Sequence, residues 1–148
     1  MFDPSQHDVR RFFCETQRKR KASEPLTPLE SIAADWIAVH PEYHVLLDRP
    51  EEALDQQFDA ADGRGNPFLH LSMHLAITEQ LSIDQPQGIR AAWQRLATRL
   101  GDEHAATHEV MECLGEVLWA AQRHHRPPDG AAYLECLLRR AGALPGQT

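Results

Sequence analysis

Apolar residues recur along the chain at the three- and four-residue spacing of one helix face, and the alternation typical of strands is rare. Together with its capping residues, this pattern predicts helices near residues 5–20, 28–39, 41–47, 66–82, 86–100, 103–124 and 129–141. Segment 48–65 has little apolar periodicity, so we expect it to be loop-rich, with room for a short helix near 51–56. The pattern predicts an all-α fold: a single-domain helical bundle of five to seven helices over residues 1–148.

Capping residues mark the ends of several of these helices. Ser5 and Asp8 have the spacing of a capping box, and the segment 27–30 combines the same box with a proline at the first helical position. Gly101 is typical of the residue after a helix, and Asp129 is typical of the residue before one.

The length of 148 residues fits one domain, and the net charge of −7 argues against a protein that mainly binds phosphate backbones. Residues 10–21 are the exception, because they carry six basic side chains and the single acid Glu15. We therefore disfavour nucleic acid as a partner, and keep an RNA-associated factor acting through this basic run as a third hypothesis. The sequence leaves a protein partner or a homodimer open.

No apolar run approaches the roughly 18–20 residues that span a bilayer, and the start of the chain lacks the pattern of a signal peptide. The cysteines, Cys14, Cys113 and Cys136, are odd in number and have no CxxC spacing, which predicts neither a disulfide framework nor a zinc knuckle. We interpret Cys113 as a buried, inert thiol. These features predict a cytoplasmic protein with no membrane association.

Histidine is the residue whose count and spacing point to chemistry. The chain has nine histidines, and three pairs of them have the i,i+4 spacing that places two rings on one helix face. The pairs are His40/His44, His70/His74 and His104/His108. Random placement of nine histidines would give roughly 0.5 such pairs, so the spacing favours a shared role.

The pairs His70/His74 and His104/His108 are expected to face inward, because apolar residues follow each of them on the same helix face. Glu112 lies one turn after His108 and offers a carboxylate beside that pair.

Glu79 and His40 are not among the expected ligands. Glu79 projects away from the second pair and is excluded from the candidate site. In the first pair Pro41 separates the two rings, and we favour His44 over His40 as the member that reaches the site.

Imidazole nitrogens are good ligands for zinc and iron, and a buried imidazole needs a partner for its polar atoms. The leading hypothesis is a protein that binds one or two divalent transition-metal ions (Zn or Fe). Its ligands would be His70, His74, His104, His108, His44 and Glu112. The alternative is a non-catalytic helical interaction module whose histidines complete a buried polar network. The pattern assigns no catalytic residue, so enzymatic activity is left open.

Four stretches of the chain form a distinctive set of motifs: His40-Pro41-Glu42-Tyr43-His44, residues 66–77, Met111-Glu112-Cys113-Leu114, and the opening with Asp3-Pro4 and residues 9–13. In these stretches the chain resembles an uncharacterised bacterial family catalogued as domain of unknown function 1841. The resemblance covers residues 1–140 and implies no activity or catalytic residue. A fainter similarity to hemerythrin-like and DinB-like bundles lacks the Glu-x-x-His pairs of di-iron proteins.

Overall fold

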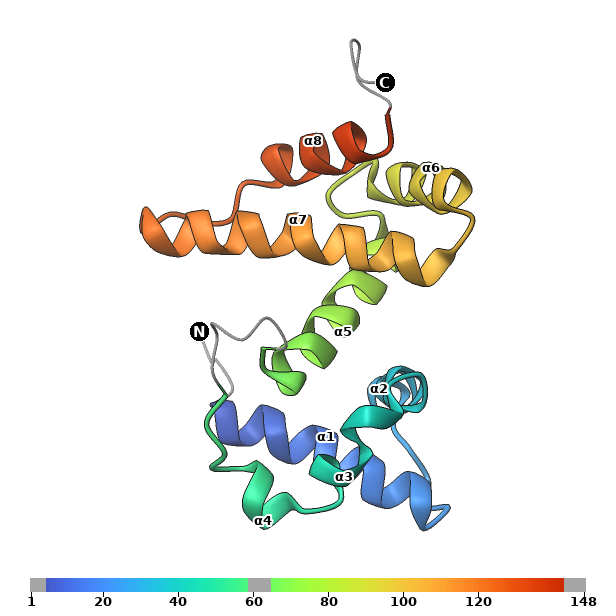
Figure 1. The fold of residues 1–148 in the computed structure, drawn as a ribbon, viewed down its shortest axis with the longest axis vertical. Coiled ribbons are helices and arrows are strands. Elements are labelled where there is room, and N and C mark those ends of the chain that lie inside the picture. The colour runs from blue at the N-terminus through green and yellow to red at the C-terminus, as the bar shows by residue number, and fades with distance from the viewer. Residues whose placement is uncertain (1–4, 59–64, 143–148) are drawn as a thin grey trace. The chain divides into compact units, whose positions relative to one another are not determined.

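Every regular element in the part of the chain that the structure describes is a helix (Figure 1). The structure is a computed structural model, and it describes residues 5–58 and 65–142. The elements are α1 (Gln6–Lys21), α2 (Pro28–Ala38), the 3-10 helix η1 (Pro41–Tyr43), α3 (His44–Leu47), α4 (Pro50–Ala53), α5 (Pro67–Ile83), α6 (Ile89–Leu100), α7 (Glu103–Arg123) and α8 (Gly130–Arg140). The predicted all-α class is confirmed.

The expected number of helices was too low. The described residues form eight α-helices, where the sequence predicted five to seven. The stretch 41–47 divides into η1 and α3. The segment expected to be loop-rich contains α4, a single turn that begins at Pro50, close to the short helix for which the sequence left room near 51–56. Residues 59–64 of that segment lie outside the described residues.

Contacts divide the chain into two compact units, residues 1–75 (unit 1) and 76–148 (unit 2). The boundary falls within α5, so the first half of this helix belongs to unit 1 and its second half to unit 2. We describe each unit by itself, and the single domain over residues 1–148 stays a prediction.

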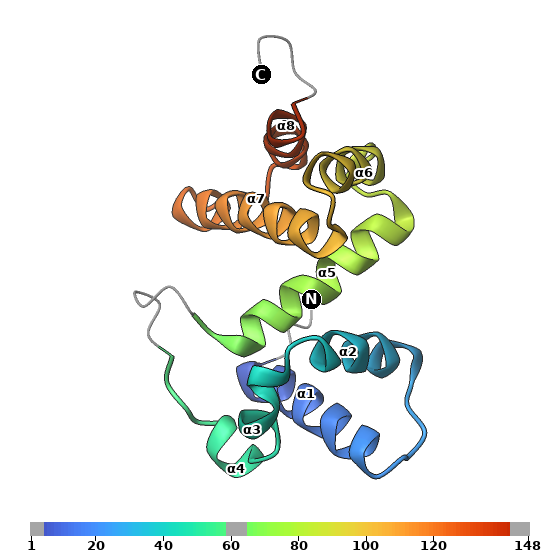
Figure 2. The same cartoon turned by 45° about the vertical axis from the view of Figure 1, so that its right-hand side comes forward.

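In unit 1, α1 packs against α2, α3 and α4 (Figure 2). The core consists of the buried residues Phe13, Cys14, Ala33, Ile37, Leu47, Ala53, Phe68 and Leu71. Arg10 is buried beside this core and donates to the carbonyl oxygens of Ala53 and Gln56, each at 2.8 Å, with its guanidinium over the rings of Phe58 and Phe68. One side chain thus fixes the chain after α4 to both α1 and α5.

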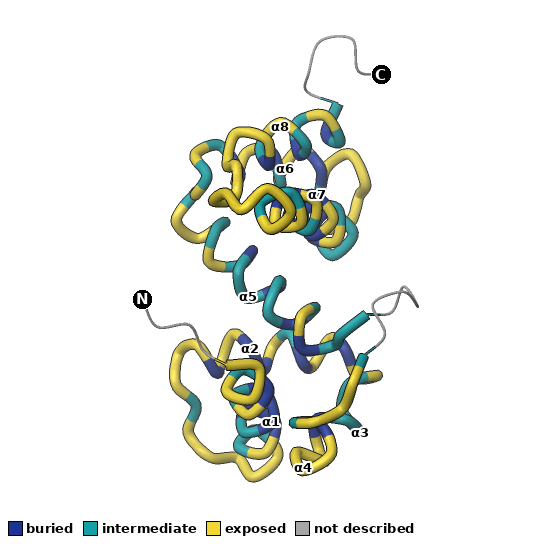
Figure 3. Tube along the Cα trace, turned by 90° about the vertical axis from the view of Figure 1, so that its left-hand side faces the viewer, coloured by how far each residue is buried: buried dark blue, intermediate teal, exposed yellow. Residues whose placement is uncertain are grey.

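Besides the second half of α5, unit 2 contains α6, α7 and α8, each of which packs against the other two. Its buried positions alternate with exposed ones along all three helices, as the burial colours in Figure 3 show. The buried apolar side chains include Ile89 and Leu96 of α6, Val110 of α7 and Leu137 of α8. This alternation is the amphipathic pattern from which the helices were predicted.

The helix caps predicted from the sequence are present. The backbone N–H of Asp8 donates to the Ser5 hydroxyl at 3.1 Å, and the Ser5 N–H donates back to the Asp8 carboxylate. Asp129 accepts from the N–H of Ala132 at 3.0 Å, and Gly101 follows α6 at a φ of 71°. The left-handed backbone at this position favours glycine, which explains why α6 ends there.

The predicted start of the helix 86–100, which is α6, was three residues early. The sequence placed it near residue 86, but α6 begins at Ile89 after a left-handed Gly88. The Asp84 carboxylate accepts from the N–H groups of Gly88 and Arg90, and these bonds hold the pKa of Asp84 below its usual value. Asp84 therefore caps the helix across an extra loop that periodicity does not reveal.

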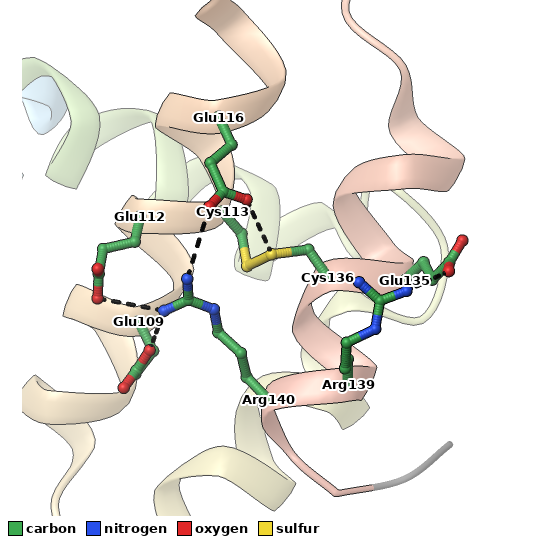
Figure 4. The surroundings of a disulfide bond; sticks show 8 residues. All are labelled: Glu109, Glu112, Cys113, Glu116, Glu135, Cys136, Arg139 and Arg140. Carbon is green, nitrogen blue, oxygen red and sulfur yellow. Dashed lines mark hydrogen bonds and ion pairs between the residues drawn. A yellow bond between two sulfur atoms is a disulfide. The ribbon is translucent and has the colours of Figure 1, made fainter. Parts of the chain in front are cut away.

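The cysteine prediction was wrong. Cys113 of α7 and Cys136 of α8 form a disulfide with a Cα–Cα distance of 5.9 Å (Figure 4). An odd number of cysteines excludes only that all are paired, so Cys14 is left as a buried free thiol. The missed signal was the turn at 124–129, which brings α8 back along α7 and places two residues 23 apart in the sequence side by side.

Candidate metal centre

Three histidine rings of unit 1 converge through their Nε2 atoms. His70 and His74 lie one turn apart on α5, and their Nε2 atoms are 3.2 Å apart. His40 precedes η1, and its Nε2 lies 3.2 Å from the same His70 nitrogen. His40 and His74 are buried, and His70 is half-buried. The arrangement gathers three imidazoles around one point inside unit 1.

The contact made by the Nδ1 atom of His40 shows which tautomer this ring adopts. Its Nδ1 lies 2.7 Å from the carbonyl oxygen of Trp36, and a carbonyl oxygen only accepts, so Nδ1 carries the hydrogen. In a neutral ring this leaves the Nε2 of His40 with a lone pair directed at His70. Metal-binding histidines in proteins have the same arrangement, with one nitrogen donating to the backbone and the other binding the ion.

Aromatic rings enclose the three imidazoles. Trp36 stacks on His74 with ring centroids 3.9 Å apart and planes 19° apart. Tyr43 lies nearly parallel to His40 with centroids 5.4 Å apart, and it meets the edge of His70 at 6.0 Å. Burial raises the pKa of Tyr43, so its hydroxyl stays protonated at neutral pH. These contacts fix the orientation of the rings.

The structure brings His40 to this group in place of the favoured His44. The Nε2 of His44 lies 2.9 Å from the carbonyl oxygen of Ile37 and donates to it, so this ring points back to α2. Our preference for His44 as the ring that reaches the group is therefore corrected. The reason is the backbone of His40, whose φ of −127° and ψ of 64° lie outside the helical region before Pro41. Helical geometry cannot predict where such a residue points.

The second predicted pair lies in unit 2, at the beginning of α7. The rings of His104 and His108 are 4.4 Å apart between centroids, and each offers a ring nitrogen within 4.8 Å of the other. In unit 1, ring nitrogens of His40 and His74 likewise lie within 4.8 Å of each other. The i,i+4 spacing therefore places two rings together in each unit, as predicted.

The expectation that His104 and His108 face inward was wrong for His108. His104 is half-buried and His108 is exposed. The buried face of α7 is formed by other residues, among them Ala106, Val110 and Val117. Of the apolar residues expected on the histidine face, Met111 is buried and Leu118 is exposed, so that face is only partly covered.

Glu112 is directed at α8. Its carboxylate lies 3.2 Å from the guanidinium of Arg140, which also pairs with Glu109, and the side chain is largely exposed (Figure 4). An ion pair with arginine satisfies this carboxylate without a metal. The role predicted for Glu112 as a ligand beside His108 stays a prediction. Glu79, which was excluded, is exposed.

Ion pairs hold most of the basic side chains that suggested a nucleic-acid partner. In the described residues these pairs are Arg11–Asp8, Arg18–Glu15, Arg18–Glu24, Lys19–Glu30 and Lys21–Asp48. The expectations about nucleic-acid and protein partners stay predictions. Of the helices in the described ranges, none is both long and apolar enough to cross a membrane.

The fold and the histidine group define the class of protein: an all-helical protein with a candidate metal centre on imidazole side chains. The chain belongs to the family described as "Domain of unknown function (DUF1841)", whose model matches residues 5–139. This confirms the resemblance seen in the sequence motifs. Comparison with curated proteins and with solved structures gave no match.

Proposed function

We propose that this protein binds a divalent transition-metal ion, zinc or iron, through His40, His70 and His74. One observation carries the proposal: the Nε2 of His70 lies 3.2 Å from the Nε2 atoms of both other rings. Because the Nε2 of a neutral His40 has a lone pair, the hydrogen of that contact must sit on His70. The same hydrogen would then have to serve His74 as well. A cation interacts favourably with all three lone pairs, whereas a single hydrogen does not.

The spacing of the nitrogens also suits a metal. Zinc binds imidazole nitrogen at about 2.0–2.1 Å, and two ligands of a tetrahedral ion are then about 3.3 Å apart. The two Nε2–Nε2 distances of 3.2 Å agree with this separation. Only small movements of the rings would be needed to accept the ion, and the stacking of Trp36 and Tyr43 already fixes the ring planes.

The chemistry of such a site follows from its ligands. Three imidazoles are neutral, so the bound ion keeps its charge of about +2 and acts as a strong Lewis acid. Catalytic zinc sites have three protein ligands with a fourth position for water or substrate. Unit 1 by itself supplies this number of ligands.

We extend the proposal to His104, His108 and Glu112 on their spacing in the sequence, with one or two ions per chain. The ring nitrogens of His104 and His108 lie within 4.8 Å of one another, which supports their inclusion. The ion pair of Glu112 with Arg140 makes this carboxylate the weakest of the proposed ligands.

Elemental analysis of untagged protein tests the proposal. We expect stoichiometric zinc or iron in the wild type and its loss in His40→Ala and His70→Ala. His44→Ala is the matched control, because His44 is four residues from His40 and donates to a backbone carbonyl, so it should retain the metal. Metal retained in both His40→Ala and His70→Ala would contradict the unit 1 site and favour the polar-network alternative.

The same measurement tests the second pair. Loss of metal from His104→Ala or His108→Ala supports their inclusion, and full retention in both restricts the site to unit 1. Glu112→Ala should reduce the metal content less than His108→Ala, and Glu79→Ala should leave it unchanged.

A further inference from the structure

The disulfide of unit 2 forms part of the wall of a cavity between α7 and α8. The cavity has a volume of about 620 Å³. Apolar side chains line part of it, among them Val117, Ala120 and Ala132. Cys136 also lines the cavity, which makes its sulfur the reactive atom nearest to any molecule bound there.

The two sulfurs of this disulfide differ in access. Cys113 is fully buried in the core of unit 2, whereas Cys136 is half-buried and contributes to the cavity wall. Thiol–disulfide exchange requires a thiolate to reach one sulfur while the other leaves. A molecule in the cavity therefore attacks Cys136, and the leaving sulfur is that of Cys113.

The charges around the cavity are mostly paired. Arg139 pairs with Glu135, and the carboxylate of Glu116 lies 3.8 Å from the guanidinium of Arg140 (Figure 4). Arg126 and Asp129 also line the cavity, and within residues 5–58 and 65–142 neither has an ion-pair partner. Arg126 offers a cation, and Asp129 offers a carboxylate that also accepts the capping bond from the N–H of Ala132, so the two suit a ligand that carries both a carboxylate and an ammonium group.

We propose that this cavity binds a small zwitterionic thiol of the cysteine class, which exchanges with the disulfide at Cys136. Its thiolate forms a bond to the Cys136 sulfur, the Cys113–Cys136 bond breaks, and Cys113 leaves as a thiolate that takes up a proton from water. A second molecule of the thiol then attacks the sulfur of the bound one. The products are the free thiols of Cys113 and Cys136 and the disulfide of the small thiol.

The surroundings of Cys136 suit the reduced product. A carboxylate oxygen of Glu116 lies 3.6 Å from the Cys136 sulfur. Once the disulfide is reduced, the Cys136 thiol can donate its hydrogen to this carboxylate, so the product has a hydrogen-bond acceptor in place.

The test uses the native oxidised chain and three thiols: cysteine, cysteamine and 3-mercaptopropionate. Mass spectrometry of trypsin-digested protein after acid quenching locates the mixed disulfide, since Cys113 and Cys136 lie on different tryptic peptides. Each rate is divided by the rate of the same thiol on the urea-unfolded chain, which removes differences in nucleophilicity. In the folded chain Cys14 does not interfere, because burial raises its pKa to about 11, and the unfolded reference uses the Cys14→Ala chain.

We expect the mixed disulfide on Cys136 and a normalised rate for cysteine about fivefold above either singly charged thiol, the factor that one exposed ion pair supplies. Arg126→Gln should remove the advantage over cysteamine, and Asp129→Asn the advantage over 3-mercaptopropionate. Asparagine caps a helix as well as aspartate does, so the second variant keeps α8 intact. Equal normalised rates, or a mixed disulfide on Cys113, would overturn the proposal.

Discussion

The two units of the chain differ in the interactions that stabilise each of them. The buried polar and charged residues of unit 1 are Arg10, Thr16, Gln17, Glu30, His40 and His74, whereas in unit 2 the described residues include only Thr107. Unit 2 instead contains the disulfide between α7 and α8. Burying polar side chains is costly unless each finds a partner, and in unit 1 Arg10 donates to backbone carbonyls while Glu30 pairs with Lys19. The two units therefore differ in what stabilises their interiors: hydrogen-bonded and ion-paired polar side chains in unit 1, and a covalent cross-link in unit 2.

Removing the metal should have the largest effect on stability, and the effect should be confined to unit 1. A ligand that binds only the folded state stabilises it by about 4 kcal/mol at a thousandfold excess over Kd. We expect chelator to lower the melting temperature of the wild type and to leave that of His70→Ala unchanged. Hydrogen exchange should localise the loss to η1 and the first half of α5. A chelator effect of equal size in His70→Ala would contradict the assignment to unit 1.

Removing the disulfide should have the next largest effect, and in the other unit. A cross-link between residues 23 apart contributes about 3 kcal/mol through the entropy of the unfolded chain. The double variant Cys113→Ala/Cys136→Ala should lose this amount in urea unfolding, with faster hydrogen exchange in α7 and α8. Cys14→Ala is the control for removing a buried cysteine outside the disulfide. Faster exchange in α1 and α2 of the double variant would break the distinction between the units.

Replacing Arg10 tests the polar core of unit 1. Arg10→Met keeps much of the apolar stem but removes the donor from the carbonyl oxygens of Ala53, Leu54 and Gln56. We expect a loss of about 2–3 kcal/mol in the free energy of unfolding, because buried acceptors lose their partner. Arg11→Met is the matched control on the same helix. Its side chain is exposed, so its effect should stay within about 0.5 kcal/mol.

The smallest expected effect concerns the capping box of α2 and its dependence on pH. The Thr27 N–H and Lys19 hold the pKa of Glu30 below its usual value of 4.5. The stabilisation by the ionised form is therefore present above about pH 4.5 and is lost as the pH falls through the lower pKa of the folded state.

Glu30→Gln should accordingly lower the stability at pH 7 and have less effect at pH 3, as measured by urea unfolding at both values. Thr27→Ala removes the other half of the box and should cost about 1 kcal/mol. An equal loss for Glu30→Gln at both pH values would show that the charge of Glu30 contributes nothing.

Local features of the sequence predicted local features of the fold. The caps at Ser5, Thr27 and Asp129 depend on residues three positions apart, and all three are present. Helices of a single turn such as α4 have no periodicity to detect, which is why the number of helices was underestimated.

The candidate site likewise contains one contact that is local in the sequence and one that is long-range. The pairing of His70 with His74 follows from helical spacing and was predicted, whereas the contact of His70 with His40 joins residues 30 apart and depends on a non-helical backbone before Pro41. The disulfide is also a long-range contact. Neither can be derived from a spacing rule that applies to one helix at a time.

The stacking of Trp36 on His74 gives unit 1 its own optical reporter. The other two tryptophans of the chain, Trp93 and Trp119, both belong to unit 2. Replacing those two by phenylalanine leaves an indole in van der Waals contact with a proposed ligand as the sole tryptophan emitter. Its emission intensity and lifetime would then report metal binding at His74 in real time and without a label. A paramagnetic ion such as Co²⁺ or Cu²⁺ should quench it, and Zn²⁺ should not.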